Sequence, residues 1–452
     1  ISLFILKPTG RGVHYGIGAY LKYLTEALLT RGDINIYVVI YLSDRKKEFY
    51  VEHTKPGLHY IHIPPPRNSF RGDEQSQKYA NRIVDFLTPF ILTCPNVVIQ
   101  TNYPDTLPIV KRLKSCFASN VVSVIHSAQW QFIFDGNKKK FTEAWINNRE
   151  GYSEKLKPVC VEKELYEISD KVISVTHYMK DFVKEFFKIP EEKIEVVPNG
   201  IDTKLLLGTN ITKKEELKQS MGFNQNEKII LYVGRLDKWK GIYFLLDEFA
   251  EVCKQYENVR LVLAGEDSGP DKISQYLAHC KNSWSKVTFT GFVDFNTMQK
   301  LYQIADIGII PSLYDHCPYV ALEMISNNVP LIVSDTEGLN EILTKDQCLY
   351  INPSVDDEGF VYFTKNEIAV AIKKLLKELY QISPFYYAVF DETIVFHTIL
   401  FTGKDWKKDV RSDNEYVNLD EDDRYIPEFY LSRITHSFLE KQWTTLPQQS
   451  VL

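Results

Sequence analysis

Short apolar runs alternate with amphipathic stretches along most of the chain. The runs hold about four to eight residues and end at Gly, Pro, Asn or Asp, as buried strands do. Between them, apolar residues recur every three or four positions, as on one face of a helix. This alternation predicts an α/β protein with parallel sheets. The predicted strands cover 1–6, 34–42, 60–64, 97–101, 121–125, 171–176, 194–198, 229–233, 259–264, 287–290, 307–310 and 331–334, and predicted helices include 19–29, 161–168 and 367–380.

The chain is too long for a single hydrophobic core. It has 452 residues, which exceeds the size at which one core stops growing, so at least two domains are expected. The turn at 198–202, where Asn-Gly follows a Pro, separates two series of strands, and such residues favour a tight turn. We therefore predict a Rossmann-like domain over 1–199, a second over 200–381, and a C-terminal extension over 382–452. Residues 64–77 are predicted to form an exposed loop.

Composition excludes several classes of function. A net charge of -6 argues against a nucleic-acid partner. The seven cysteines form no Cys-x-x-Cys pair, which indicates a reduced, cytoplasmic protein with no zinc ribbon and no disulfide framework. No apolar run approaches the length of a transmembrane helix, and the apolar start of the chain is too short and uncharged for a signal peptide. The three lysines at 138–140 are interpreted as solvated surface, so membrane contact is at most peripheral.

Two carboxylates follow one apolar run in the stretch 306–343. Asp315 lies in the loop after 307–310, and Glu323 lies eight residues later in a helix that Pro318 opens. Ligands of parallel sheets bind beyond the carboxyl ends of the strands. Carboxylates accept several hydrogen bonds from vicinal hydroxyls, and a helix N-terminus favours phosphate. The stretch predicts a site for a sugar joined to a phosphate, although a capping acid and a surface Glu would give the same pattern.

Two cations follow the first strand of the second series. Strand 229–233 ends in Gly234, and Arg235 and Lys240 come five residues apart before a helix that starts near Ile242. Together with the positive end of that helix, two cations would neutralise a diphosphate leaving group. Either cation alone fits a solvated basic turn. Both reach the same sheet edge as the two carboxylates, however, and this favours the functional interpretation.

Two features of the first series are expected at a similar edge. Strand 121–125 ends in His126, which places the imidazole at a ligand-binding edge, with a simple strand cap as the alternative. Gly16 and Gly18 belong to a Gly-rich loop before helix 19–29, and glycine lets a ligand approach the backbone closely. The dinucleotide fingerprint G-x-G-x-x-G is absent, and a plain turn is an equal alternative.

These motifs resemble those of the retaining glycosyltransferases of glycosyltransferase family 4, which have the GT-B architecture of two Rossmann-like domains facing a cleft. The family pattern of an acid, seven residues and a Glu is represented by Asp315 and Glu323. Residues 234–241 match Gly-Arg-Leu…Lys-Gly, and 337–341 match a Gly-Gly-x-x-Glu-like turn. Residues 316–319 depart from the usual Gly-Phe-Gly-Leu, and their proline has no N–H to offer to a phosphate or sugar.

The resemblance implies a function and a set of site residues. A hexose or N-acetylhexosamine would pass, with retention at the anomeric carbon, from a UDP- or GDP-linked nucleotide diphosphate-sugar to a glycan, lipid-linked or peptide acceptor. The implied catalytic residues are Arg235, Lys240, His126 and Asp315. The implied donor-binding residues are Gly16, Gly18, Arg235, Lys240, Gly265, Phe292, Val293, Asp315, Cys317, Tyr319 and Glu323.

The same motifs leave alternatives. No Asp-x-Asp triplet lies in a suitable loop, so we expect no metal and no cofactor other than the nucleotide-sugar co-substrate. The extension 382–452 departs from the family pattern. It either crosses back to the first domain, as the last helix of this fold class does, or forms a separate packing or partner module. A catalytically weak sugar-nucleotide-binding scaffold subunit and a nucleotide-sugar epimerase are the alternative functions, and the oligomeric state is open.

Overall fold

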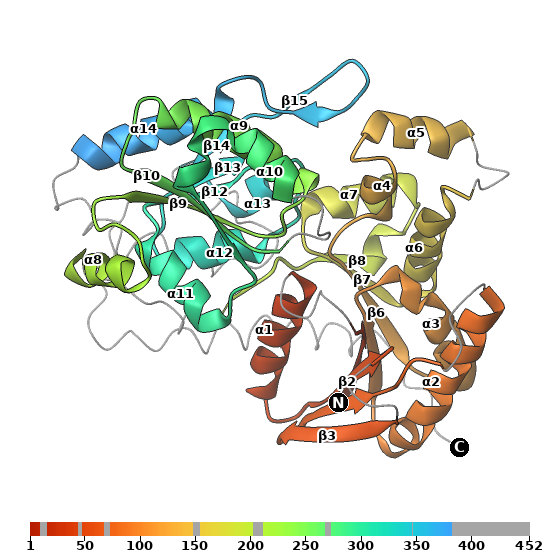
Figure 1. Cartoon of the computed structure of the whole chain (residues 1–452). Helices are drawn as coiled ribbons and strands as arrows, with labels where there is room; N and C mark the ends of the chain where they lie inside the picture. Colours follow the sequence, from red (N-terminus) through yellow and green to blue (C-terminus); the bar gives the residue numbers. More distant parts are fainter. Residues whose placement is uncertain are drawn as a thin grey trace, which may run out of the picture. The chain divides into compact units, whose positions relative to one another are not determined.

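The structure, a computed structural model, describes residues 1–9, 16–43, 48–66, 73–147, 154–201, 211–266, 273–345 and 347–381 (Figure 1). These residues form two compact units. The first holds Ile1–Val124 and Leu165–Ile173, and the second holds Ile125–Glu164 and the described chain from Ser174 onward. The predicted extension 382–452 lies outside the described residues, and the predicted domain boundaries stay a prediction. None of the helices in the described ranges combines the length and the apolarity that crossing a bilayer requires.

The strands of the first unit belong to an eight-stranded sheet and run within it in the order β3-β4-β2-β1-β5-β6-β7. Most neighbours are parallel, whereas β3 is antiparallel to β4 at the edge. Without β3, this is the 3-2-1-4-5-6 order of a doubly wound sheet, and the order reverses between β1 and β5. The elements are β1 (Ser2–Pro8), α1 (Ile17–Leu29), β2 (Asn35–Tyr41), β3 (Tyr50–Lys55), β4 (Leu58–His62), α2 (Asp73–Thr93), β5 (Val97–Thr101), η2 (Pro104–Thr106), α3 (Leu107–Cys116), β6 (Asn120–Ile125) and β7 (Lys171–Ser174).

Two details of the first unit differ from the sequence-based expectation. The sequence does not predict β3, because its end is exposed at His53 and Lys55 and no apolar run marks it. The loop predicted over 64–77 is too long, since α2 begins at Asp73. The later turns of α2 bury apolar residues such as Leu87, and this burial stabilises a helix whose first turns are polar.

The second unit carries a six-stranded sheet in the order β11-β10-β9-β12-β13-β14, and all its neighbours are parallel. This is again the 3-2-1-4-5-6 order, and it reverses between β9 and β12. The predicted α/β class with two parallel-sheet domains is confirmed. Elements that begin in this unit are α4 (Gln129–Ile133), α5 (Lys138–Asn147), α6 (Lys157–Ile168), α7 (His177–Phe186), η3 (Glu191–Lys193), β8 (Ile194–Val196), α8 (Ile211–Ser220), β9 (Lys228–Val233), η5 (Lys238–Lys240), α9 (Ile242–Cys253), β10 (Val259–Ala264), α10 (Ile273–Cys280), η7 (Lys281–Lys286), β11 (Val287–Gly291), α11 (Phe295–Ile304), β12 (Ile307–Ile310), α12 (Tyr319–Ser326), β13 (Leu331–Ser334), α13 (Leu339–Ile342), β14 (Cys348–Ile351), β15 (Ser354–Val355), β16 (Val361–Tyr362) and α14 (Glu367–Gln381).

Both faces of the second sheet are buried. On β9, Ile230 and Tyr232 belong to a core shared with α9, α10 and α14. Ile229, Leu231 and Val233 belong to a second core shared with α11 and α12 (Figure 1). Alternate residues of a strand point to opposite faces, so a strand covered on both sides is apolar throughout. This is why β9 is visible in the sequence as a continuous apolar run.

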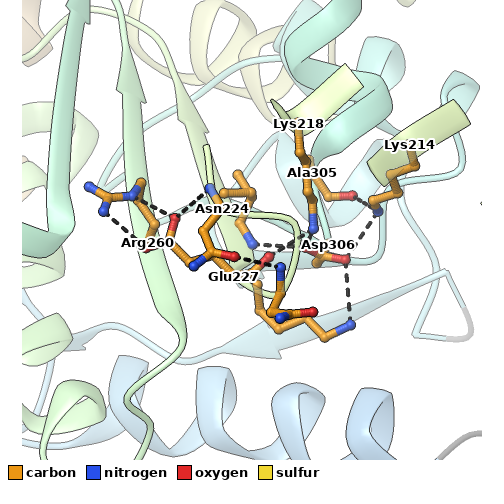
Figure 2. Close-up of polar contacts among 10 residues, drawn as sticks. Lys214, Lys218, Asn224, Glu227, Arg260, Ala305 and Asp306 are labelled. Atoms are coloured by element: carbon orange, nitrogen blue, oxygen red, sulfur yellow. Dashed lines mark hydrogen bonds and ion pairs between the residues drawn. The ribbon is translucent and has the colours of Figure 1, made fainter. Parts of the chain in front are cut away.

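A buried carboxylate lies at the amino edge of the second sheet, just before β12 (Figure 2). Asp306 is 3% exposed and pairs with Lys218 at 2.8 Å, with Lys214 at 3.1 Å and with Lys228 at 3.8 Å. It also accepts a 2.8 Å hydrogen bond from the Ile229 amide. Burial acts to raise the pKa of Asp306, but the three lysines outweigh burial and the pKa lies below its ordinary value.

A second ion pair extends this charged edge to β10 (Figure 2). The Arg260 guanidinium donates to both carboxylate oxygens of Glu227, each at 2.9 Å. Lys218 joins the two pairs, because its ammonium also donates to the Glu227 carbonyl at 2.8 Å. The network thus fastens α8 to the beginnings of β9, β10 and β12.

Candidate functional site

The candidate site consists of the loops that follow β9 and β12 at the carboxyl edge of the second sheet. The strand order reverses between these two strands, which is where doubly wound sheets bind ligands. The loops are joined directly, because the Leu313 amide donates to the Trp239 carbonyl at 2.8 Å. Gly241 precedes α9 with φ 68°, and a Cβ atom there would lie 1.9 Å from the Pro311 carbonyl oxygen. Glycine is therefore required where the two loops cross.

One predicted cation and one predicted carboxylate meet at this edge. Lys240 Nζ lies 2.6 Å from Asp315 Oδ2, and the two side chains are 23% and 11% exposed. Ser312 Oγ donates to the same oxygen at 3.0 Å. Asp237 fixes the turn that carries Lys240, because its carboxylate accepts from the amides of Trp239 and Lys240. No hydrogen bond from the described residues reaches Asp315 Oδ1, so this oxygen can accept from a ligand.

Arg235 lies on the loop that also carries Lys240. Its side chain is 55% exposed, and Nη2 lies 3.3 Å from Asp237 Oδ2. The backbone at this position is held firmly, because the buried Tyr232 hydroxyl donates to the Arg235 carbonyl at 2.6 Å. The loop therefore presents an exposed guanidinium on a fixed backbone.

Glu323 lies on α12, and its carboxylate is oriented from a neighbouring helix. Its Oε2 accepts a 2.6 Å hydrogen bond from the hydroxyl of Tyr302, a buried residue of α11. Pro318 is the N-cap of α12, as the sequence predicts. Because proline has no N–H, the first amide of this helix belongs to Tyr319, a buried residue.

Cys317 is buried in the loop before α12 with an unusual backbone. Its φ of 53° is in the left-handed region, which costs a non-glycine residue about 1–3 kcal/mol. Asn199 holds it there, since the Asn199 amide donates to Cys317 Sγ at 3.3 Å and Asn199 Nδ2 donates to the Cys317 carbonyl at 2.7 Å. Burial raises the pKa of the Cys317 thiol to about 12, so the group stays protonated at neutral pH.

Glycines bring the carboxyl ends of β9, β10 and β11 together. The Gly265 amide donates to the Gly291 carbonyl at 3.0 Å. A Cβ atom at Gly265 would lie 1.8 Å from the Gly234 carbonyl oxygen. Phe292 and Val293 follow β11 directly, and Phe292 is 42% exposed. The predicted residues of these three strand ends therefore share one edge of the sheet with Lys240 and Asp315.

His126 follows β6 at the start of the second unit. It is partly accessible, yet desolvation lowers its pKa to about 3, so the imidazole is neutral near pH 7. Two residues later, Ala128 is the N-cap of α4. Gln131 Oε1 accepts from the Ala128 amide at 3.3 Å and makes a 3.0 Å contact with His316 Nε2. Because His316 directly follows Asp315, this contact connects the turn of His126 to the Asp315 loop.

The remaining predicted residues, Gly16 and Gly18, belong to the first unit. Gly16 is the N-cap of α1 with φ 53°, and Gly18 is buried in the first turn of that helix. Residues 10–15 of the Gly-rich loop lie outside the described residues.

Three structural partners of the site are not predicted from the sequence. Tyr302 orients Glu323, but a buried tyrosine in a helix gives no signal that separates it from ordinary core. Gly338 packs against the site with φ 107°, and a Cβ atom there would lie 2.2 Å from the Asp315 carbonyl oxygen. Gln131 gives no capping-box signal either, because the N-cap three residues before it is Ala128, whose side chain cannot accept the hydrogen bond that such a box requires.

Comparison with known proteins identifies relatives for both halves of the chain. Residues 213–380 match the family described as Glycosyl transferases group 1, and residues 15–205 match Glycosyltransferase Family 4. An uncharacterized glycosyltransferase of Methanocaldococcus jannaschii is 36% identical over 176 residues, which cover 39% of this chain and 45% of that protein. The chain spans about half the length of the first curated relatives it matches.

Two solved structures share the fold. Sucrose-phosphate synthase from Thermosynechococcus elongatus has a TM-score of 0.65 and 20% identity, covering 83% of this chain and 90% of that one. HepE from Anabaena, in complex with UDP-glucose, has a TM-score of 0.59 and 16% identity, covering 88% of this chain and 96% of that one. These similarities confirm the predicted GT-B fold class. With family matches over most of its length, the chain belongs to the group 1 glycosyltransferases of glycosyltransferase family 4.

Proposed function

We propose that this chain transfers a hexose or N-acetylhexosamine from a UDP- or GDP-linked nucleotide diphosphate-sugar to a glycan, lipid-linked or peptide acceptor, with retention at the anomeric carbon. The observation that supports this best is the Lys240–Asp315 pair at the carboxyl edge of the second sheet, 2.6 Å apart, with Arg235 on the same loop. The related fold of HepE, solved with UDP-glucose, supports a nucleotide-sugar as the donor.

The two cations would act on the leaving group. Transfer breaks the bond between the anomeric carbon and the diphosphate, so negative charge grows on the departing nucleoside diphosphate. Lys240 is already held in place by Asp315, and the exposed Arg235 side chain can turn towards a bound diphosphate. Fixed cations stabilise developing charge more than water does, because they need little reorganisation. The acceptor oxygen forms the new glycosidic bond and its hydroxyl loses a proton, which an oxygen of the departing diphosphate can take up.

The carboxylates would hold the hydroxyl groups of the donor. Asp315 Oδ1 would accept from the donor sugar, and Glu323, oriented by Tyr302, would accept from the ribose. His126 would contact the sugar as a neutral hydrogen-bonding group, since its pKa of about 3 leaves it uncharged. Further donor contacts are proposed for Gly16, Gly18, Gly265, Phe292, Val293, Cys317 and Tyr319, with Phe292 and Val293 beside the base.

We also propose that transfer needs no metal ion and no cofactor. Arg235 and Lys240 supply the positive charge that a divalent cation would otherwise bring to a diphosphate. The seven cysteines are free thiols, which fits a reducing compartment such as the cytoplasm.

A binding screen tests the donor site first. Thermal shifts are measured with UDP, GDP, ADP, CMP and dTDP, each with Mg²⁺ and with EDTA. A ligand at a hundred times its dissociation constant stabilises by about 2.7 kcal/mol. We expect one nucleoside diphosphate to stand out equally in both buffers. A flat response to all of them would contradict the donor site, and a response only with Mg²⁺ would contradict metal independence.

Turnover of labelled nucleotide-sugars then tests the roles of the cations. Lys240→Met and Arg235→Ala should each lower kcat by about 100-fold or more, as loss of an electrostatic stabiliser does. Lys238→Met is the matched control from the same loop, because Lys238 pairs with Asp135 at 2.7 Å and has no assigned role. Unchanged turnover in both variants would show that the roles are wrong. Binding without turnover would favour the scaffold alternative, which the missing N–H of Pro318 motivates, and an epimerised donor would favour the epimerase.

A further inference from the structure

The Gln131 side chain accepts hydrogen bonds from two different loops of the second unit. It lies in the first turn of α4, and Oε1 accepts from the Ala128 amide at 3.3 Å. The same oxygen lies 3.0 Å from Nε2 of His316. His316 is 9% exposed and follows Asp315 directly, while Ala128 lies two residues after His126. One side chain thus joins the turn 126–131 to the loop that pairs with Lys240.

The contacts define which nitrogen of His316 carries the proton. A backbone amide can only donate, so the Gln131 atom facing Ala128 must be the carbonyl oxygen. That oxygen can only accept, and His316 must therefore donate to it from Nε2–H. In the neutral ring the other nitrogen, Nδ1, is then unprotonated. Burial is the main cause that lowers the pKa of His316, to about 4. Lys240 adds to this lowering, whereas the nearby Asp315 opposes it. The ring is therefore neutral near pH 7, with this tautomer present.

The ring of His316 is also held on its face. It stacks on the Tyr178 ring with centroids 5.7 Å apart and planes at 14°. The Tyr178 amide donates to Glu341 Oε1 at 2.8 Å, so the stacking partner belongs to a fixed helix start. The ring is held on its face by Tyr178 and at one nitrogen by Gln131, so it can fix the position of one loop relative to the other.

We propose that His316 is a positioning residue that, through Gln131, holds the turn of His126 in register with the Asp315–Lys240 pair. This proposal rests on the proposed transferase function, in which His126 and Asp315 contact the donor sugar. Catalytic groups that must act on one substrate need relative placement to better than about 1 Å, and misplacement of that size costs about 100-fold in rate. His316 itself donates its hydrogen bond to Gln131 and needs no contact with the reacting atoms.

The test compares His316→Leu, which removes the donor, with His316→Gln, whose amide N–H can reach the same oxygen. Steady-state kinetics and donor hydrolysis are measured for both, for Gln131→Leu and for the double variant His316→Leu/Gln131→Leu. We expect each leucine variant to lower kcat by about 10- to 100-fold with little change in donor KM, and His316→Gln to recover most of the loss. The double variant should be no worse than the single variants, because both break one link.

Three results would overturn the proposal. They are unchanged kcat in His316→Leu, a raised donor KM at unchanged kcat, which would mean direct donor binding, and additive losses in the double variant. Nitrogen NMR of the imidazoles supplies a readout without substrate: Nε2 of His316 should be protonated and Nδ1 unprotonated at pH 7, and the opposite tautomer would refute the link. A wild-type chain that turns over no donor refutes the proposed function, whereas an active wild type with an unaffected His316→Leu variant refutes the positioning alone.

Discussion

Asp306→Asn should strongly destabilise the second unit without touching the candidate site. The carboxylate is 3% exposed, and its close partner Lys218 is 4% exposed. Asparagine keeps one carbonyl oxygen for the Ile229 amide and Lys218, but it removes the negative charge that Lys214, Lys218 and Lys228 share in their ion pairs (Figure 2). Breaking a buried ion pair by removing one partner costs about 3–5 kcal/mol, because the remaining charge is buried unpaired.

The lower end of that range applies here. Lys214 is 16% exposed and Lys228 is 25% exposed, so both can regain some hydration when the carboxylate is lost. A loss of about 3 kcal/mol in a unit of this size corresponds to a Tm lower by about 6–12 °C. Tryptophan fluorescence is a suitable probe, since Trp130, Trp145, Trp239 and Trp284 all lie in the second unit.

Two companion variants sharpen the test. Glu191→Gln removes an exposed carboxylate that pairs with Lys180 and Lys184, and it should leave Tm unchanged, as surface pairs contribute little. Lys218→Met in the Asp306→Asn background should recover part of the loss, because it removes one of the charges left unpaired. If Asp306→Asn melts within about 2 °C of the wild type, against the 6–12 °C expected, the buried-charge reasoning is wrong.

Three further predictions follow from single contacts. Tyr302→Phe removes the hydrogen bond that orients Glu323 and should raise the donor KM by about fivefold at unchanged kcat, as loss of about 1 kcal/mol of uniform binding does; a fall in kcat would contradict that role. Glu341→Gln weakens the acceptor for the amides of His177 and Tyr178 at the start of α7 and should lower Tm by about 2–4 °C, or about 1 kcal/mol, an outcome that an unchanged melting curve would exclude. The folded-state pKa of His316 is about 4 and its ordinary value is 6.5, so the folded chain binds fewer protons than the unfolded chain in that interval. The contribution of His316 to the free energy of unfolding is therefore fully present above about pH 6.5 and is lost as the pH falls towards 4, a change of about 3 kcal/mol. In His316→Gln, Tm measured against pH should fall less steeply across that interval, and an equally steep fall would assign the acid sensitivity to other groups.

Most of the fold is predictable from the sequence because both sheets are covered on two faces. A strand buried on both sides has to be apolar at every position, and β10 and β13 are predicted with their observed bounds for this reason. The edge strand β3 lacks that constraint, since its exposed positions tolerate His and Lys. The helix α2 is not predicted, because its polar first turns resemble a loop until the buried residues that follow are considered.

The candidate site is predictable in part, and the limit has a physical cause. Arg235, Lys240 and Asp315 stand at strand ends, so the sheet order brings them to one edge whatever the details of the loops. The ion pair between Lys240 and Asp315, by contrast, depends on where the two loops cross. The close contact between Gly241 and Pro311 sets this crossing point, and the spacing of residues along the chain does not predict that contact. The contact between His316 and Gln131 joins residues 185 positions apart, and a single sequence carries no record of such a pair.

The two edges of the second sheet use charge in opposite ways, and this separates stability from function. At the amino edge, Asp306 and Lys218 are almost fully buried and satisfied by the chain itself. At the carboxyl edge, Arg235 is 55% exposed, and Asp315 keeps one oxygen that no hydrogen bond from the described residues reaches. A group already satisfied in the fold has little left for a ligand, whereas a fixed but incompletely satisfied group can bind one. Asp306→Asn should therefore lower Tm while the remaining folded enzyme keeps its kcat, and Arg235→Ala should lower kcat while Tm is preserved. The same result from both variants would mean that this division between the two edges is wrong.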